Sequence, residues 1–296
     1  MGYSWVKCRC DIRVTARFGT VTPTTLADFL LPDGFERPRV HAVLGEGRVI
    51  GEAGRYALEA VHLRGERRHT PYSHRATGRA EDPVMLVPGF MAGDGTLALM
   101  RRALQQQGLR TYRSHIRANV GCTLDVAAQM EMRLESIAER RGSLVRIVGH
   151  SLGGMLARGV AARRPDLVSG LVTMGSPMLA PGAHHVSLSA SVAMLVRLSR
   201  AGIPGVMAED CVSGTCARRS FDDGRAPLAD SVDFTAIYSR RDGIVDWRAC
   251  IDPLATPVEV RASHVGMAID PRVIAAVTAA LRPAFSAVEV DRGEIA

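Results

Sequence analysis

From residue 83 onward, short apolar runs alternate with stretches of helical periodicity. Uninterrupted apolar runs closed by Gly or Pro are typical of strands that are buried on both faces. Such runs, together with one alternating segment, predict strands over 84–87, 109–116, 144–148, 167–174, 234–238 and 258–260. Apolar residues spaced three and four apart predict helices over 97–107, 123–141, 152–163 and 271–281. The alternation predicts an α/β fold with a mostly parallel central sheet and helices on both faces.

The first 82 residues lack this regularity. Gly and Pro interrupt them repeatedly, and only residues 55–63 have the spacing of a short helix. Gly45, Gly47 and Gly51 look superficially like a dinucleotide-binding fingerprint, but the third glycine comes one position late and no βαβ unit surrounds it. We therefore predict a turn-rich loop here, followed by a linker over 64–82. The chain divides into an N-terminal extension of unknown role, 1–82, and a main domain, 83–296.

Composition narrows the class of protein. The 296 residues are 47% hydrophobic and 23% charged, which excludes wholesale disorder. The net charge is +7, yet Lys7 is the only lysine and Asn119 the only asparagine. A nucleic-acid-binding protein usually mixes Lys with Arg and clusters them on one face, so this arginine-rich composition does not indicate a nucleic-acid partner. No run of about 18 apolar residues and no secretory signal is visible, and we expect a cytoplasmic protein.

The six cysteines are Cys8, Cys10, Cys122, Cys211, Cys216 and Cys250. None of them forms the C-x-x-C pairs of a zinc site, so the spacing predicts no metal centre. Cys211 and Cys216 are close enough in the chain to close a small disulfide loop, and two free thiols are an equally good interpretation.

The strongest chemical motif is Gly149-His150-Ser151-Leu152-Gly153-Gly154. It lies where a predicted strand ends and a helix begins, which is the context of a G-x-S-x-G nucleophile elbow. Such a turn exposes the serine hydroxyl and places the next amide at the positive end of a helix. We predict Ser151 as a nucleophile and the Leu152 amide as one oxyanion donor. The loop after the first strand offers the second donor, the Phe90 amide, with Met91 as its alternative.

A serine nucleophile needs a base and an acid that orients the base. On a nucleophile elbow the chain order is Ser, acid, His. His264 follows the last predicted strand and is the predicted base, whereas His184 and His185 are expected at the surface or in a lid. Asp242, just after a strand and before Gly243, is the predicted acid. Asp246 and Asp252 are its competitors.

Taken together, these segments resemble an α/β-hydrolase of the bacterial lipase/carboxylesterase type. The resemblance covers about residues 83–282 and rests on five segments in the right order: Pro88-Gly89-Phe90, Gly149 to Gly154, Gly175-Ser176-Pro177, Tyr238 to Val245 and Ser263 to Gly266. One departure is Pro88-Gly89, where many lipases have His-Gly. The resemblance implies that residues 178–232, longer than a plain crossover, form a cap or lid. It leaves open whether 1–82 holds the first strands of the sheet.

The expected activity is hydrolysis of carboxylic esters through an acyl-enzyme on the Ser151–Asp242–His264 triad, with no cofactor and no metal. An acyltransferase that uses the same acyl-enzyme and a non-catalytic binding protein with this fold are the alternatives. The expected partner is a small ester or lipid substrate, and the basic charge allows transient contact with a lipid surface.

Overall fold

The computed structural model describes residues 27–67 and 82–282, and its centre is a six-stranded sheet. The strands are β1 (Val84–Val87), β2 (Thr111–Arg113), β3 (Val145–His150), β4 (Val168–Met174), β5 (Asp233–Tyr238) and β6 (Thr256–Glu259). Their order is β2-β1-β3-β4-β5-β6, and every neighbouring pair is parallel. The predicted fold class is therefore confirmed.

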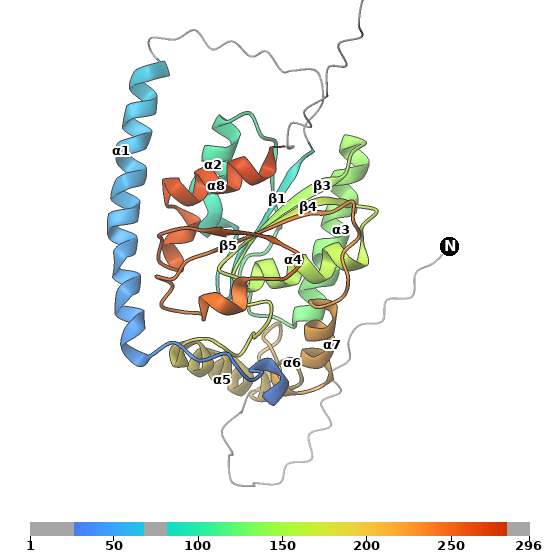
Figure 1. Cartoon of the computed structure of the whole chain (residues 1–296). Coiled ribbons are helices and arrows are strands. Elements are labelled where there is room, and N and C mark those ends of the chain that lie inside the picture. The colour runs from blue at the N-terminus through green and yellow to red at the C-terminus, as the bar shows by residue number, and fades with distance from the viewer. Residues whose placement is uncertain (1–26, 68–81, 283–296) are drawn as a thin grey trace, which may run out of the picture.

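Helices cover both faces of the sheet (Figure 1). On one face lie α3 (Thr123–Arg141) and α4 (Leu152–Arg163), and on the other α2 (Ala98–Gln106) and α8 (Pro271–Leu281). Strand β1 is apolar throughout because both of its faces are buried. Met85 and Val87 pack in the core with α3 and α4, while Val84 and Leu86 pack with α2 and α8.

The helices predicted over 123–141, 152–163 and 271–281 are confirmed at both ends. Strand β2 is shorter than the predicted 109–116. The Asp94 carboxylate accepts hydrogen bonds from the backbone N–H groups of Ser114 and His115, so the chain leaves the sheet after Arg113. A 3₁₀ turn, Asp94–Leu97, precedes α2 and replaces the start of the predicted helix over 97–107.

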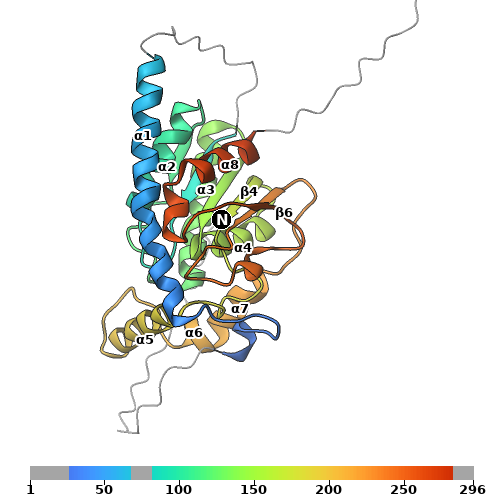
Figure 2. The same cartoon turned by 60° about the vertical axis from the view of Figure 1, so that its left-hand side comes forward.

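The N-terminal extension is more helical than its sequence indicates. It contains the 3₁₀ segments Asp28–Leu30 and Val40–Arg48, followed by α1 (Val49–Arg67). The prediction of a loop around Gly45–Gly51 is therefore wrong, and so is that of a linker over 64–67; residues 68–81 lie outside the described part. Figures 1 and 2 show α1 alongside α8. In the described ranges no strand precedes β1.

The connection between β4 and β5 carries α5 (Val186–Arg200), α6 (Asp210–Ser213) and α7 (Thr215–Asp223). These helices lie together at one end of the molecule, and α7 packs against α3 and α4 (Figure 2). We call residues 178–232 the cap. Gating by the cap stays a prediction.

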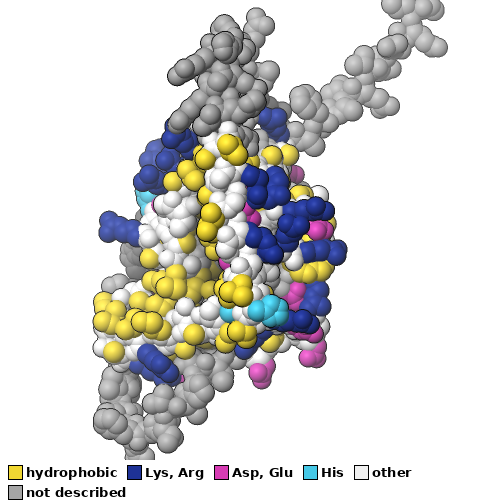
Figure 3. All heavy atoms as spheres, turned by 90° about the vertical axis from the view of Figure 1, so that its left-hand side faces the viewer, with side chains coloured by type: hydrophobic (Ala, Val, Ile, Leu, Met, Phe, Trp, Pro, Cys, Tyr) yellow, Lys and Arg dark blue, Asp and Glu magenta, His cyan; other side chains and the backbone are white. Residues whose placement is uncertain are grey.

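Hydrophobic side chains gather on the face that carries α1 and α5 (Figure 3). The exposed apolar residues of these elements include Ile50 and Leu58 of α1 and Val186 and Met194 of α5, and Leu44 is exposed in the 3₁₀ segment before α1. None of the helices in 27–67 or 82–282 combines the length and the apolar character needed to cross a bilayer.

Arg158 is a fully buried cation in α4, the helix that starts at the elbow. Its Nε donates to Asp252 Oδ2 at 3.2 Å, and its guanidinium also donates to the Ala226 carbonyl. We expect Arg158→Ala to lower the free energy of unfolding by about 3–5 kcal/mol, because Asp252 is left as a buried, unpaired charge. Denaturant unfolding measures this.

The half-exposed pair Arg200–Glu209 provides the control. Arg200→Ala is expected to cost less than about 1 kcal/mol, because solvent screens an exposed ion pair. Equal costs for the two arginine substitutions would show that the Arg158 pair has no special role in stability.

Candidate active site

Ser151 lies in the tight turn between β3 and α4, with a φ of 52°. A Cβ on Gly149 would overlap the backbone of Gly154, and a Cβ on Gly153 would overlap the carbonyl of Val87. Both glycines are therefore required by close backbone approach. The turn is the strand–serine–helix geometry of a nucleophile elbow, held in a conformation that is costly for a non-glycine residue.

The two predicted oxyanion donors border the same cavity as Ser151. Leu152 is the first residue of α4, where backbone N–H groups have no partner inside the helix. The Phe90 amide follows β1 and makes no hydrogen bond within 27–67 or 82–282. Its neighbour Met91 has a φ of 57°, so the loop has a tightly specified conformation.

Asn119 holds this loop in place. The side chain is buried, its Nδ2 donates to the Pro88 carbonyl at 3.0 Å, and its backbone exchanges hydrogen bonds with Met91 and Ala92. No motif in the neighbouring sequence marks Asn119 for this role. The only available signal was that it is the sole asparagine of the chain.

Asp242 and His264 lie together. His264 Nδ1 and Asp242 Oδ2 are 2.6 Å apart, and Asp242 Oδ1 accepts the backbone N–H groups of Ile244 and Val245. A Cβ on Gly175 would lie 3.1 Å from His264 Nδ1 and 3.2 Å from Asp242 Oδ2. The glycine of the Gly175-Ser176-Pro177 segment thus leaves room for this pair.

The two competing carboxylates are engaged elsewhere. Asp246 caps the 3₁₀ turn Trp247–Cys250 and pairs with Arg248, while Asp252 pairs with Arg158. Of the three candidates, only Asp242 is bonded to His264. Ser151 follows the last residue of β3, His150, whose ring centroid is 4.9 Å from that of His264. The Ser151 hydroxyl has no hydrogen-bond partner in the described residues.

The electrostatic surroundings favour a charged His264. Its burial opposes the imidazolium form, but the charge and hydrogen bond of Asp242, together with Glu46, outweigh burial and raise the pKa of His264 above its usual value. His150 is different, because burial and the neighbouring His264 lower its pKa to about 3. His150 is therefore neutral and its Nε2 faces the His264 carbonyl, which requires the proton to be on Nε2.

Two carboxylates of the N-terminal extension fix the His264 loop. Glu46 Oε1 accepts the backbone N–H groups of Gly243 and His264, and its Oε2 accepts that of Val265. Glu52 accepts the backbone N–H and the hydroxyl of Ser263. Both glutamates are buried. Because Glu46 bonds to both loops, it ties the acid loop to the histidine loop. Sequence reasoning missed both glutamates, since they lie in a segment predicted to be a loop.

His184 and His185 are not at the surface, so that part of the prediction is wrong. Both are buried. His185 caps the N-terminus of α5 and its Nε2 lies 3.0 Å from the carbonyl of Val40. His184 borders the cavity beside Ser151. Both lie in the cap, as the alternative half of the prediction has it, and His185 connects the cap with the extension.

A largely apolar cavity opens at Ser151, with about 1010 Å³ of empty space including its mouth. The core supplies Phe90, Leu152 and Met155 to its wall. The cap supplies Leu188, Val192 and Phe221, and the extension adds Leu30. Such a cavity fits an apolar small molecule better than a charged one.

Three of the described cysteines lie close together, and one of them, Cys211, borders this cavity. Cys211 and Cys216 do not form the disulfide that the sequence left open, and Cys122 forms no disulfide with either of them. A hydrogen bond with Cys211 lowers the pKa of Cys122 to about 6 and raises the pKa of Cys211. Cys8 and Cys10 lie outside the described residues.

The sheet order, the elbow and the Asp–His pair define the class: the protein has the α/β-hydrolase fold. Residues 83–199 match the family model described as alpha/beta hydrolase fold. The match begins at the predicted domain boundary and includes Phe90, Ser151 and Leu152.

Among solved structures, the chain is similar to the lipase BlEst2 of Bacillus licheniformis. With its mature form the identity is 14%, the TM-score is 0.56, and the alignment covers 72% of this chain and 96% of that one. The propeptide form gives the same identity, TM-score and coverage of this chain, which spans about half (52%) of its length. At this identity the likeness shows a shared fold. No curated protein matches by sequence.

The contact of Glu46 with the His264 loop predicts a change in titration. We expect Glu46→Gln to lower the pKa of His264, because the substitution removes a negative charge that stabilises the imidazolium. The midpoint of the His264 ring titration, followed by NMR, should move to lower pH. A His264→Gln sample identifies the resonance.

Glu52→Gln is the matched control. The substitution makes the same charge change at a buried carboxylate that bonds to the same loop, through Ser263. Glu52 is, however, not among the groups that raise the pKa of His264. An equal shift in both variants would mean that a general loosening of the loop, and not the charge of Glu46, sets the titration.

Proposed function

We propose that the protein is a serine hydrolase that cleaves carboxylic esters with an apolar acyl group. The observation that carries the proposal is a serine in a strained elbow at an apolar cavity, directly after His150, whose ring lies 4.9 Å from that of His264 in a buried Asp–His pair. The relation to a lipase in fold supports the same class of reaction.

In the proposed mechanism, the Ser151 hydroxyl attacks the ester carbonyl while His264 Nε2 takes its proton. Asp242 holds Nδ1, so the free Nε2 is the nitrogen that faces the reaction. The amides of Phe90 and Leu152 donate to the oxyanion of the tetrahedral intermediate. His264 then protonates the leaving alcohol, and a water molecule, activated by the same histidine, releases the acid and regenerates Ser151.

The Ser151 hydroxyl makes no hydrogen bond to the described residues, and its hydrogen bond to His264 would form when substrate fills the cavity. Catalytic hydrogen bonds often tighten only in the substrate complex. The apolar wall supports an acyl chain as the buried part of the substrate. Exposed apolar residues on α1 and α5 support transient contact with a lipid surface.

The assignment of Ser151 is tested with nitrophenyl esters of increasing chain length. We expect Ser151→Ala to lower kcat/KM by about 10⁴-fold or more, because no other group replaces the nucleophile. Ser191→Ala changes a half-buried serine of α5 that does not border the cavity, and it should retain activity. A fluorophosphonate should label the parent protein and not Ser151→Ala. Equal turnover by parent and Ser151→Ala contradicts the proposal, and ester products formed with an added alcohol would identify an acyltransferase.

The assignment of the acid has its own control in the chain. Asp242→Asn is expected to lower kcat by about 10⁴-fold with little effect on folding, since the amide favours the wrong histidine tautomer. Asp246→Asn changes the competing carboxylate and should leave kcat within about threefold, because Asp246 bonds to Arg248 and the Glu36 amide. The reverse ranking would make Asp246 the acid.

A further inference from the structure

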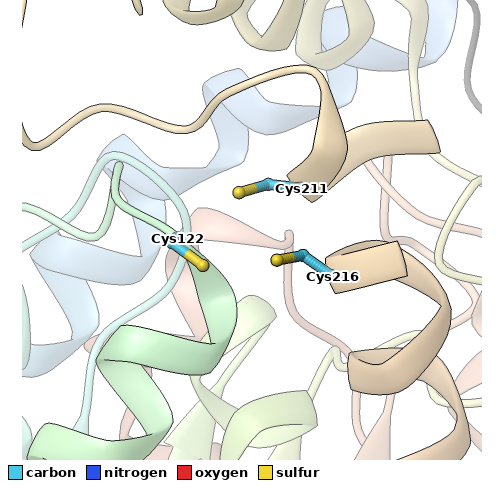
Figure 4. A group of neighbouring side chains, drawn as sticks. All are labelled: Cys122, Cys211 and Cys216. Carbon is cyan, nitrogen blue, oxygen red and sulfur yellow. The ribbon is translucent and has the colours of Figure 1, made fainter. Parts of the chain in front are cut away.

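Three thiols from three separate elements meet where the cap joins the core. Cys122 caps the N-terminus of α3, Cys211 lies in α6 and Cys216 in α7. Their Sγ atoms all lie within 4.8 Å of one another, and Figure 4 shows the three side chains directed toward a common point. Spacing along the chain did not predict this cluster, because the fold brings Cys122 to a pair that is distant in sequence.

Hydrogen bonds of other groups hold the thiols in these positions. The Met207 N–H donates to the Val120 carbonyl at 2.7 Å and so joins the cap to the loop before α3. The Asp210 carboxylate accepts the backbone N–H groups of Thr215 at 2.8 Å and Cys216 at 3.2 Å. These bonds fix the corner between α6 and α7, so both cap cysteines face Cys122. The cluster is preorganised without help from a ligand.

We propose that Cys122, Cys211 and Cys216 bind one divalent thiophilic metal ion of the Zn²⁺ type, which fastens the cap to the core. With Zn–S bonds of about 2.3 Å, a tetrahedral site has its sulfurs about 3.8 Å apart. The observed separations need to contract by only about 1 Å, a shift that side-chain rotation provides. Three thiolates are donors that soft metals prefer over oxygen ligands.

Charge favours a divalent ion over a monovalent one. Three thiolates leave a net charge of −1 around Zn²⁺ and −2 around Cu⁺, and the thiols belong to an apolar cluster with Leu195, Val196 and Val212. Buried net charge is costly there, so the smaller charge is preferred. The N-terminus of α3, with its partial positive charge, lies at Cys122 and offsets part of it. Binding releases the proton of each thiol that is still protonated.

The position of the metal has a consequence for the cap. Cys211 and Thr123 both border the cavity at Ser151, so the fourth coordination position is available to water beside the substrate site. With three metal–sulfur bonds in place, α6 and α7 cannot separate from α3 unless a ligand leaves. Any opening of the cap is then confined to α5 and the segments around it.

The experiment uses the full chain with Cys8→Ser and Cys10→Ser, because these two cysteines lie outside the described residues and could bind metal themselves. The reduced, metal-free protein is titrated with Co²⁺, whose spectrum reports thiolate ligands and tetrahedral geometry, and then with Zn²⁺. We expect one Co²⁺ per chain, a thiolate-to-cobalt charge-transfer band, its loss on addition of Zn²⁺, and a higher Tm with Zn²⁺.

Each of Cys122→Ser, Cys211→Ser and Cys216→Ser is expected to weaken Co²⁺ binding by more than about tenfold, since even outer-shell changes have effects of this size. Cys250→Ser is the matched control, a buried free cysteine outside the cluster. Ser151→Ala should bind Co²⁺ like the parent, which separates this test from the proposed hydrolase activity. The proposal is overturned if the charge-transfer band is absent or if the band survives the three cluster substitutions. A disulfide within the cluster, in protein isolated with Zn²⁺ present, would also overturn it.

Discussion

The close approach of α4 to the ends of β1 and β3 is the constraint on which the site depends. The start of α4 touches the backbone of β3 through Gly149 and Gly154, and that of β1 through Gly153. This contact holds Ser151 in its strained conformation and places Leu152, the first residue of α4, at the cavity. Side chains at any of the three glycines would push the helix away, and both the Ser151 hydroxyl and the Leu152 amide would move with it.

The fixed position of Ser151 defines a site only if the loops around it are fixed as well. Buried polar side chains hold these loops in place. Asn119 holds the loop after β1, and Glu46 and Glu52 hold the loop of His264. In each case one side chain satisfies backbone groups that would otherwise be buried without partners. Such bonds specify position more sharply than apolar packing does, because they are directional. The negative charge of Glu46 adds an electrostatic effect to the positional one.

The parts of the fold that could be predicted are those with a local signal. The buried parallel strands have continuous apolar runs in the sequence, and α3, α4 and α8 have apolar residues at helical spacing. The elbow is marked by glycines on both sides of a serine. His264 and Asp242 could be placed by chain order because each follows a strand. Glu46, Glu52 and Asn119 could not, since their partners are backbone groups distant in sequence and nothing in their own neighbourhood marks them. The same holds for Cys122, whose relation to Cys211 and Cys216 exists only after the cap has folded onto the core.

The segment that matches the family model contains only part of the candidate site, and the other residues of the site lie before and after it. The matched segment, 83–199, holds Ser151, the proposed nucleophile, and Phe90 and Leu152, the proposed oxyanion donors. The proposed acid, the proposed base and the cap cysteines follow it, and the glutamates that fix the histidine loop precede it. The cavity wall likewise combines core residues with Leu30 of the extension and Phe221 of the cap. The extension is therefore part of the site and not an appendage. The shape of the cavity wall is therefore set jointly by the matched segment, the extension and the cap.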